Sequence, residues 1–133
     1  MVSRRIASLP LEHIVGWAEF CGLRIAVDPG VFIPRRRTEF LVQQAIRLAE
    51  PLANPIVVDL CCGSGAVGTA IVRCLRQAEL YAADVDPSAV QCARRNIAAS
   101  GHVFFHGWVG AYPKPPPYGS IWIPLSEPRH VGP

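Results

Sequence analysis

The sequence predicts an α/β fold with a parallel β-sheet, and three observations support this prediction. Two short apolar runs, IVVDL at residues 56–60 and ELYAADV at residues 79–85, have the length and composition of buried strands. Each run is followed by a segment in which apolar residues recur at helical spacing. Gly63, Gly65 and Gly68 lie between the first run and its helix. Because strands that alternate with helices form parallel sheets, we expect a Rossmann-like arrangement.

Upstream of this sheet, the sequence predicts a β-hairpin and an amphipathic helix. The stretch WAEFCGLRIAVDPG has alternating apolar residues beside a turn at Cys21-Gly22. The stretch TEFLVQQAIRLAE places its apolar residues on one helical face, with Thr38 as the N-cap. For the helix that follows the second strand, we expect Asp86 as the N-cap and Gly101 as the residue that closes the end.

Composition restricts the class of protein. A domain commonly contains about 100–150 residues, so a chain of 133 residues forms at most one. The net charge of +3 is modest, and no basic run is interleaved with aromatic residues, so composition does not favour nucleic acid. No segment reaches about 18 apolar residues, and the five cysteines show no CxxC pairing. We therefore expect a cytoplasmic protein with no membrane segment, no metal site and no disulfide framework.

The segment after Gly101 differs from the rest. Seven of the thirteen prolines lie in residues 113–133, and we expect an irregular Pro-rich tail from about residue 106. VFF at 103–105 and SIWI at 120–123 are the candidate strands of this segment. With these two, the predicted sheet has four strands in the order 3-2-1-4.

The glycine loop and two acids indicate the class of ligand. Residues 63–68, GSGAVG, fit the G-x-G-x-x-G template between a strand and a helix, where backbone N–H groups can approach a ligand. Asp84 follows Gly63 by about 20 residues, as expected for a carboxylate that binds ribose hydroxyls. Asp59 lies where it would repel the pyrophosphate of NAD(P). S-adenosylmethionine has no phosphate, and its sulfonium and ammonium groups are positively charged, so Asp59 favours S-adenosylmethionine over NAD(P). A tight turn that binds no ligand remains an alternative interpretation of the loop.

These motifs resemble those of a known family. VVDLCCGSGAVG, YAADVDPSAV and ARRN resemble the cofactor motifs of class I methyltransferases, which use S-adenosylmethionine. PLEHIVGWAEFCGLRIAVDPGVFIPRRRTEFLV is similar to the linker hairpin of the release-factor glutamine N5-methyltransferase family, and the similarity spans about residues 10–100. The resemblance implies a Rossmann-like class I methyltransferase fold. It also implies methyl transfer from S-adenosylmethionine to a glutamine side-chain amide of a peptide-chain release factor, with no direct contact to nucleic acid or membrane.

The resemblance further implies that residues 32–35, Thr38 and Glu39 form a lid over the cofactor. Together with the residues argued above, the predicted cofactor-binding set comprises Phe32, Pro34, Arg35, Thr38, Asp59, Gly63, Ser64, Gly65, Asp84 and Val85. The chain departs from the family at Cys61, where many members have glycine, and at Arg36-Arg37, which replaces a proline–acid pair. We interpret Cys61 and Cys62 as small buried side chains.

The family's catalytic signature, N-P-P-Y after the fourth strand, is absent from the sequence. Its expected position holds Glu127, Pro128, Arg129 and His130. We interpret the chain as a C-terminally truncated or degraded member, with an N-terminal segment and linker hairpin at 1–37 and a partial methyltransferase domain at 38–133. We expect no methyl transfer from it as it stands. A non-catalytic cofactor-binding or interaction fragment and an NAD(P)-binding oxidoreductase remain alternatives, and the oligomeric state stays open.

Overall fold

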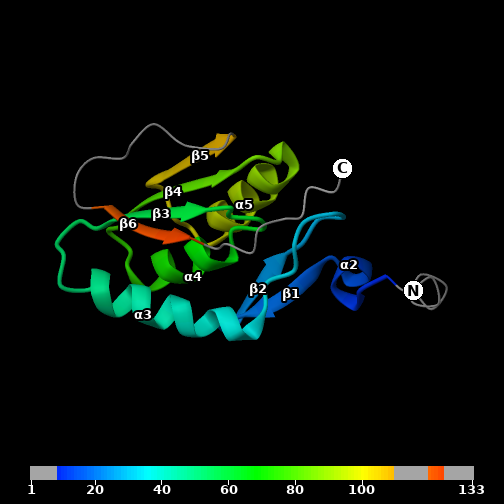
Figure 1. Cartoon of the computed structure of the whole chain (residues 1–133), viewed down its shortest axis with the longest axis horizontal. Helices are drawn as coiled ribbons and strands as arrows, with labels where there is room; N and C mark the ends of the chain where they lie inside the picture. The colour runs from blue at the N-terminus through cyan, green and yellow to red at the C-terminus, as the bar shows by residue number, and fades with distance from the viewer. Residues whose placement is uncertain (1–8, 110–119, 125–133) are drawn as a thin grey trace.

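A four-stranded sheet forms the centre of the structure, a computed structural model in which residues 9–109 and 120–124 are described (Figure 1). In sheet order, its strands are β5 (Phe105–Val109), β4 (Glu79–Asp84), β3 (Ile56–Leu60) and β6 (Ser120–Pro124). All three neighbouring pairs are parallel. The predicted α/β class, the parallel sheet and the strand order 3-2-1-4 are therefore confirmed.

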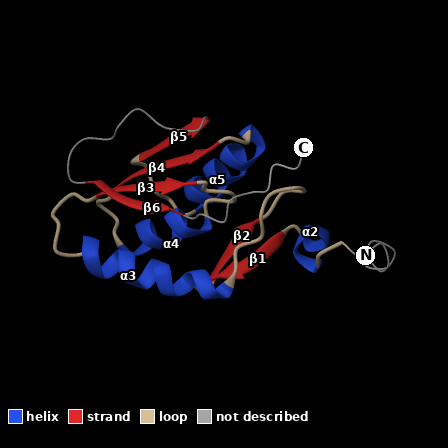
Figure 2. Ribbon diagram, in the orientation of Figure 1, coloured by secondary structure: helices blue, strands red, loops and turns tan. Residues whose placement is uncertain are grey.

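Three helices connect and cover the sheet (Figure 2): α3 (Glu39–Ala49), α4 (Ala66–Cys74) and α5 (Pro87–Ala99). Helix α4 joins β3 to β4, and α5 joins β4 to β5, as parallel neighbours require a crossover connection. Buried residues of all three helices share one core with Val57, Leu80 and Ala82 of the sheet. Because Leu80 and Ala82 are two residues apart on one strand, this core lies on a single face of the sheet. None of the described helices is long and apolar enough to cross a membrane.

A short helix and an antiparallel hairpin precede the sheet: α2 (Leu11–Val15), β1 (Trp17–Phe20) and β2 (Leu23–Ala26). The turn at Cys21 and Gly22 lies where it was predicted. Both residues have positive φ, +49° and +73°, as a two-residue type I′ hairpin turn requires. Phe20 and Ile25 are buried in the same core as the helices, so the hairpin packs onto the sheet domain.

The start of α3 differs from the prediction. A 3-10 turn, η1 (Arg36–Thr38), precedes the helix, and Thr38 occupies the N-cap position without a side-chain capping bond. Its backbone has helical angles, φ −74° and ψ −15°, whereas a capping side chain usually needs an extended backbone. Thr38 therefore takes the predicted N-cap position, but its side chain does not cap the helix. Asp86 does cap α5, because its side chain accepts a hydrogen bond from Ser88 N.

The segment after α5 is more regular than expected. Gly101 has φ +79° and closes the helix as predicted, and the next strand begins at Phe105. Strand β5 therefore includes residues 106–109, where we expected an irregular tail, and it begins two residues later than VFF. The reason is tertiary, because this backbone pairs with Leu80–Asp84 across a parallel register. SIWI is confirmed as part of β6.

Candidate functional site

The glycine loop runs from the carboxyl end of β3 to the start of α4. Gly63 and Gly65 have φ of +54° and +75°, a region in which other residues are strained. A Cβ atom on Gly65 would lie 2.7 Å from the Cβ of Ala93 in α5. A Cβ atom on Gly68 would lie 3.1 Å from Oδ2 of Asp59. The Gly65 contact is too close for any other residue without a shift of the helix, and the Gly68 contact is tight.

Asp84 lies beside this loop at the end of β4. Its Oδ2 accepts a hydrogen bond from the N–H of Gly63 at 3.0 Å, and its Oδ1 accepts one from the N–H of Asp86, also at 3.0 Å. These two bonds set the orientation of the buried carboxylate. The structure therefore brings together Gly63 and Asp84, which the sequence placed in one site by their spacing.

Asp59 is the second acid, and its side chain is fully buried at the other side of the loop. Its Oδ2 accepts a hydrogen bond from the N–H of Gly68 at 3.1 Å, whereas its Oδ1 has no partner within the described part of the chain. Burial raises the pKa of the Asp59 carboxyl to about 7; the Gly68 bond opposes this shift, and the charge of Asp84 adds to it. An unpaired buried charge is costly, so a cationic ligand group near the loop stabilises the ionised form of Asp59, whereas a phosphate destabilises it.

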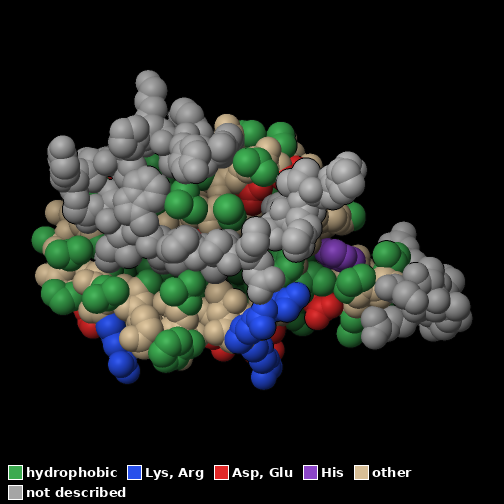
Figure 3. All heavy atoms as spheres, in the orientation of Figure 1, with side chains coloured by type: hydrophobic (Ala, Val, Ile, Leu, Met, Phe, Trp, Pro, Cys, Tyr) green, Lys and Arg blue, Asp and Glu red, His purple; other side chains and the backbone are tan. Residues whose placement is uncertain are grey.

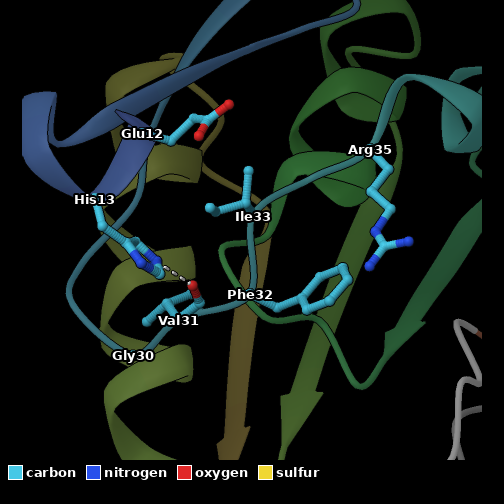
Figure 4. A pocket seen from close by; sticks show the side chains of 7 residues that line it. All are labelled: Glu12, His13, Gly30, Val31, Phe32, Ile33 and Arg35. Atoms are coloured by element: carbon cyan, nitrogen blue, oxygen red, sulfur yellow. Dashed lines mark hydrogen bonds between the residues drawn. The ribbon is translucent and has the colours of Figure 1, made fainter. Parts of the chain in front are cut away.

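A pocket of about 550 Å³ adjoins the predicted lid (Figure 4), and it is lined by Glu12, His13, Gly30, Val31, Phe32, Ile33 and Arg35. Figure 4 shows Phe32 and Arg35 on one side of it, with Glu12 and His13 of α2 on the other. The Arg35 guanidinium lies 5.3 Å from the centre of the Phe32 ring. On the opposite side, Nε2 of His13 forms a hydrogen bond of 2.9 Å with the Val31 carbonyl, which ties α2 to the lid.

The lid residues divide into two groups. Phe32 is next to the glycine loop, since a Cβ atom on Gly63 would lie 3.9 Å from its Cβ, and it lines the pocket together with Arg35. Pro34 and Thr38 do not line the pocket. The Glu39 carboxylate accepts a hydrogen bond of 2.9 Å from the backbone N–H of the hairpin-turn residue Cys21. Glu39 therefore joins α3 to the hairpin.

Ser64 and Val85, two further residues of the predicted cofactor-binding set, differ in exposure. Ser64 is buried, and its carbonyl accepts a hydrogen bond of 2.8 Å from Nδ2 of Asn96. Val85 is 62% exposed directly after β4. Val109, also exposed, ends β5 opposite Asp84. Two exposed apolar side chains therefore follow neighbouring strands at the carboxyl edge, where a flat apolar ligand surface can pack.

Sequence reasoning missed Val109 and gave no role to Asn96. Val109 was missed because we expected an irregular tail there. Asn96 had a signal in the sequence: it lies on the apolar face of α5 with Cys92 and Ile97, and it is only 6% exposed. A polar side chain in such a place is nearly always hydrogen-bonded. The position of Asn96 in the sequence therefore predicts that its side chain forms hydrogen bonds inside the protein, but it does not predict with which segments.

The two adjacent cysteines have different environments. Cys62 is buried as interpreted, and burial raises the pKa of its thiol, so it has the character of an inert side chain. Cys61 is exposed, and the interpretation that it is buried is wrong. Its φ of +54° turns the chain directly after β3, and this explains why glycine suits the position.

The departures from the family pattern lie at two further places. The arginines at 35–37 are exposed, and Figure 3 shows a group of basic side chains near the start of α3. The four residues at the expected catalytic position, Glu127, Pro128, Arg129 and His130, lie outside the described residues.

Comparison with known proteins gives the relationship of the chain. A family model described as "Methyltransferase small domain" matches residues 22–111. A "Release factor glutamine methyltransferase" of Streptomyces coelicolor is 36% identical over 146 residues, which cover 100% of this chain and 50% of that protein. A "Release factor glutamine methyltransferase" of Corynebacterium glutamicum is 46% identical over 97 residues, which cover 72% of this chain and 35% of that protein. The chain thus spans half or less of the length of these relatives.

A solved structure supports the fold. The crystal structure of wild-type Trm5b from Pyrococcus abyssi has a TM-score of 0.59 and 19% sequence identity, and the match covers 71% of this chain and 28% of that one. This likeness agrees with the Rossmann-like sheet and carries no information on substrate. Because the family model takes in most of the chain, including the hairpin strand β2, the glycine loop and both acids, the chain belongs to the methyltransferase small domain family.

Proposed function

We propose that the chain binds S-adenosylmethionine at the glycine loop, and that this site serves methyl transfer to the side-chain amide nitrogen of a glutamine in a peptide-chain release factor, a reaction for which the chain by itself lacks the N-P-P-Y signature. The observation that carries the proposal is the buried carboxylate of Asp59, which has an oxygen without a partner among the described residues and lies against the loop at Gly68. Membership of a methyltransferase family implies use of S-adenosylmethionine in general.

Electrostatics favour this cofactor over a dinucleotide. Asp59 and Asp84 lie on either side of the loop, and the charge of Asp84 raises the pKa of Asp59 further beyond the effect of burial. The carboxylate of Asp59 would repel a pyrophosphate, whereas an acid at the place of Asp84 suits the ribose of either cofactor. The sulfonium and ammonium of S-adenosylmethionine are attracted instead, and the sulfonium carries the methyl group that is transferred.

Five of the predicted cofactor-binding residues have places that fit their roles. Asp84 would bind the ribose hydroxyls, because it ends β4 next to the loop. Gly63 and Gly65 would let the backbone approach the ligand. Phe32 would cover the ligand from the lid side, since it lies against the loop, and Val85 would pack against the adenine.

The substrate is proposed from the relatives. Two proteins named release factor glutamine methyltransferase share 36% and 46% identity with the chain over the matched residues.

A second function is favoured by one feature of the sequence. Glu127 and Arg129 stand at the positions of the Asn and the second Pro of the N-P-P-Y signature. This difference favours cofactor binding without methyl transfer.

Calorimetry with three ligands tests the cofactor. We expect S-adenosylmethionine and S-adenosylhomocysteine to bind, and NAD to bind far more weakly. Tighter binding of NAD than of S-adenosylhomocysteine would show that the ligand is assigned wrongly.

A transfer assay tests the reaction. The chain is incubated with S-adenosylmethionine labelled in the methyl group and with a release factor, and a release factor in which the target glutamine is replaced serves as the control. Label in the first protein alone supports glutamine methylation. Cofactor binding without any label would favour the second function.

A further inference from the structure

We propose that Asn96 is a positioning residue of the cofactor site, because it holds the glycine loop and the linker hairpin against one helix, α5. This inference rests on the proposed function, in which the loop and the lid that follows the hairpin enclose the cofactor. Asn96 acts through these segments and need not touch the ligand itself.

The Asn96 side chain forms three hydrogen bonds with two segments that are distant in the sequence. Its Oδ1 accepts from the N–H of Ala26, and its Nδ2 donates to the carbonyls of Ala26 and Ser64, each at 2.8 Å. Both N–H groups of the amide are thereby used. The Asn96 amide bonds both the N–H and the carbonyl of Ala26, as the backbone of a neighbouring strand would. It thereby satisfies the backbone hydrogen-bonding groups of Ala26 at the end of β2.

Neighbouring residues of α5 contact the same two segments. Cys92 Sγ donates a hydrogen bond of 3.2 Å to the Ala26 carbonyl. Ala93 lies so close to Gly65 that a Cβ atom there would be 2.7 Å away. On the surface, Arg95 forms an ion pair with Asp28, two residues after the end of β2. One helix therefore contacts both sides of the proposed site.

The two backbone carbonyls that Asn96 binds belong to the glycine loop and to the segment that leads to the lid. Ser64 stands between Gly63, whose N–H is bonded to Asp84, and Gly65, whose N–H is bonded to the Cys62 carbonyl. Ala26 is followed by the loop that leads to Phe32. Without the Nδ2 donor, the carbonyls of Ser64 and Ala26 lose a shared partner, and only the contacts of Cys92, Ala93 and Arg95 still hold the two segments to α5.

The test uses the full chain with Asn96→Asp and Asn96→Ala. Asn96→Asp keeps the size of the side chain and an acceptor for the Ala26 N–H, but places an oxygen against the two carbonyls. Ile97→Val is the matched control, because it removes one buried methyl group from the same helix and lowers stability without any polar contact to loop or hairpin. All variants are compared where they are fully folded.

Two measurements are made on each protein. We expect both Asn96 variants to bind S-adenosylhomocysteine about tenfold or more weakly than the wild type, and Ile97→Val to bind like the wild type. In the protein without ligand, we expect hydrogen exchange to accelerate at the Gly65 amide in both Asn96 variants and at the Ala26 amide in Asn96→Ala, with amides in β3 unchanged. Ile97→Val should show no such local pattern.

Several results of these measurements would overturn the proposal. Wild-type affinity and exchange in a folded Asn96 variant would overturn the proposal. Equal weakening by Ile97→Val, or loss of the fold in both Asn96 variants, would also overturn it, since Asn96 would then serve only overall stability. If the wild type binds no S-adenosylhomocysteine, the proposed function fails, and the exchange pattern alone decides whether Asn96 joins the loop to the hairpin.

Discussion

The charge of Asp59 can be removed with little change of shape by the substitution Asp59→Asn. The asparagine keeps an oxygen that can accept the hydrogen bond from the N–H of Gly68, which is 3.1 Å long in the wild type. It cannot ionise, and so it cannot carry the buried charge. The free energy of unfolding and the affinity for ligand should therefore respond to pH differently in the two proteins.

The size and sign of the difference follow from the pKa of Asp59. Burial raises this pKa to about 7 in the folded protein, whereas in the unfolded chain it is about 4. Between these values the folded state keeps a proton that the unfolded state has released, so the free energy of unfolding falls as pH rises and stays low above pH 7. At about 1.4 kcal/mol per pKa unit, the full difference is about 4 kcal/mol, and about 3 kcal/mol of it lies between pH 5 and pH 8.

Urea denaturation at pH 5 and pH 8 measures this effect. We expect the wild type to lose about 3 kcal/mol relative to Asp59→Asn over this interval. The new amide can leave an unpaired N–H group, which costs about 1–3 kcal/mol at both pH values and does not alter the change with pH. An equal pH dependence of the two proteins would refute the conclusion that Asp59 titrates in this range.

Ligand binding should couple to the same proton. A cationic cofactor beside Asp59 favours the ionised form, so S-adenosylmethionine should release a proton on binding below pH 7 and bind more tightly as pH rises from 5 to 8. In Asp59→Asn the affinity should be weaker and nearly independent of pH. Calorimetry in buffers of different ionisation enthalpy counts the released protons. Their absence in the wild type would refute the placement of the cationic groups near Asp59.

Three further substitutions test separate parts of the site. Asp84→Ala should weaken binding of S-adenosylhomocysteine by about 1.5–3 kcal/mol, measured by calorimetry. Unchanged affinity in a folded protein would remove Asp84 from the site. Asp84→Asn, whose single side-chain oxygen can keep only one of the two backbone bonds, serves as the comparison. Gly65→Ala should lower the free energy of unfolding by more than Gly101→Ala does. Both glycines have positive φ, so each substitution costs about 1–2 kcal/mol of backbone strain, but only the new Cβ at Gly65 would clash, at 2.7 Å from Ala93. Equal losses in the two variants would contradict this clash. Asp86→Ala should cost about 1 kcal/mol in urea denaturation through loss of the α5 N-cap, and no loss would mean that the cap is not needed.

Local sequence determined most of the regular structure. The strands β3 and β4, the helices α4 and α5 and the turn at Cys21-Gly22 are where the sequence predicted them. Apolar periodicity, glycine and an N-cap acid act over a few residues, so they can be recognised without knowledge of the fold. The same kind of signal located the glycine loop and its two acids, because parallel strands bring their carboxyl ends to one edge of the sheet.

Local signals failed where the residue type does not reveal the backbone conformation or the strand pairing. Thr38 has the right side chain for an N-cap, but the preceding 3-10 turn gives its backbone helical angles. Cys61 is small and follows a buried strand, yet its positive φ places it in a turn with an exposed side chain. The apolar run VFF indicated a strand at 103–105, but the extent of β5 to Val109 follows from its pairing with β4.

The tertiary structure alone decided how the site is assembled. Asn96 contacts Ala26, 70 residues earlier in the chain, and Ser64, 32 residues earlier, and no pattern along the sequence specifies such partners. The same holds for the contact between Phe32 and the glycine loop. Sequence could place an acid at the end of β3, but only the packing around Asp59 leaves one of its oxygens buried without a partner among the described residues. The reason is physical: periodicity reports which side of an element is buried, whereas hydrogen bonds and charge states depend on which atoms the fold brings within about 3 Å.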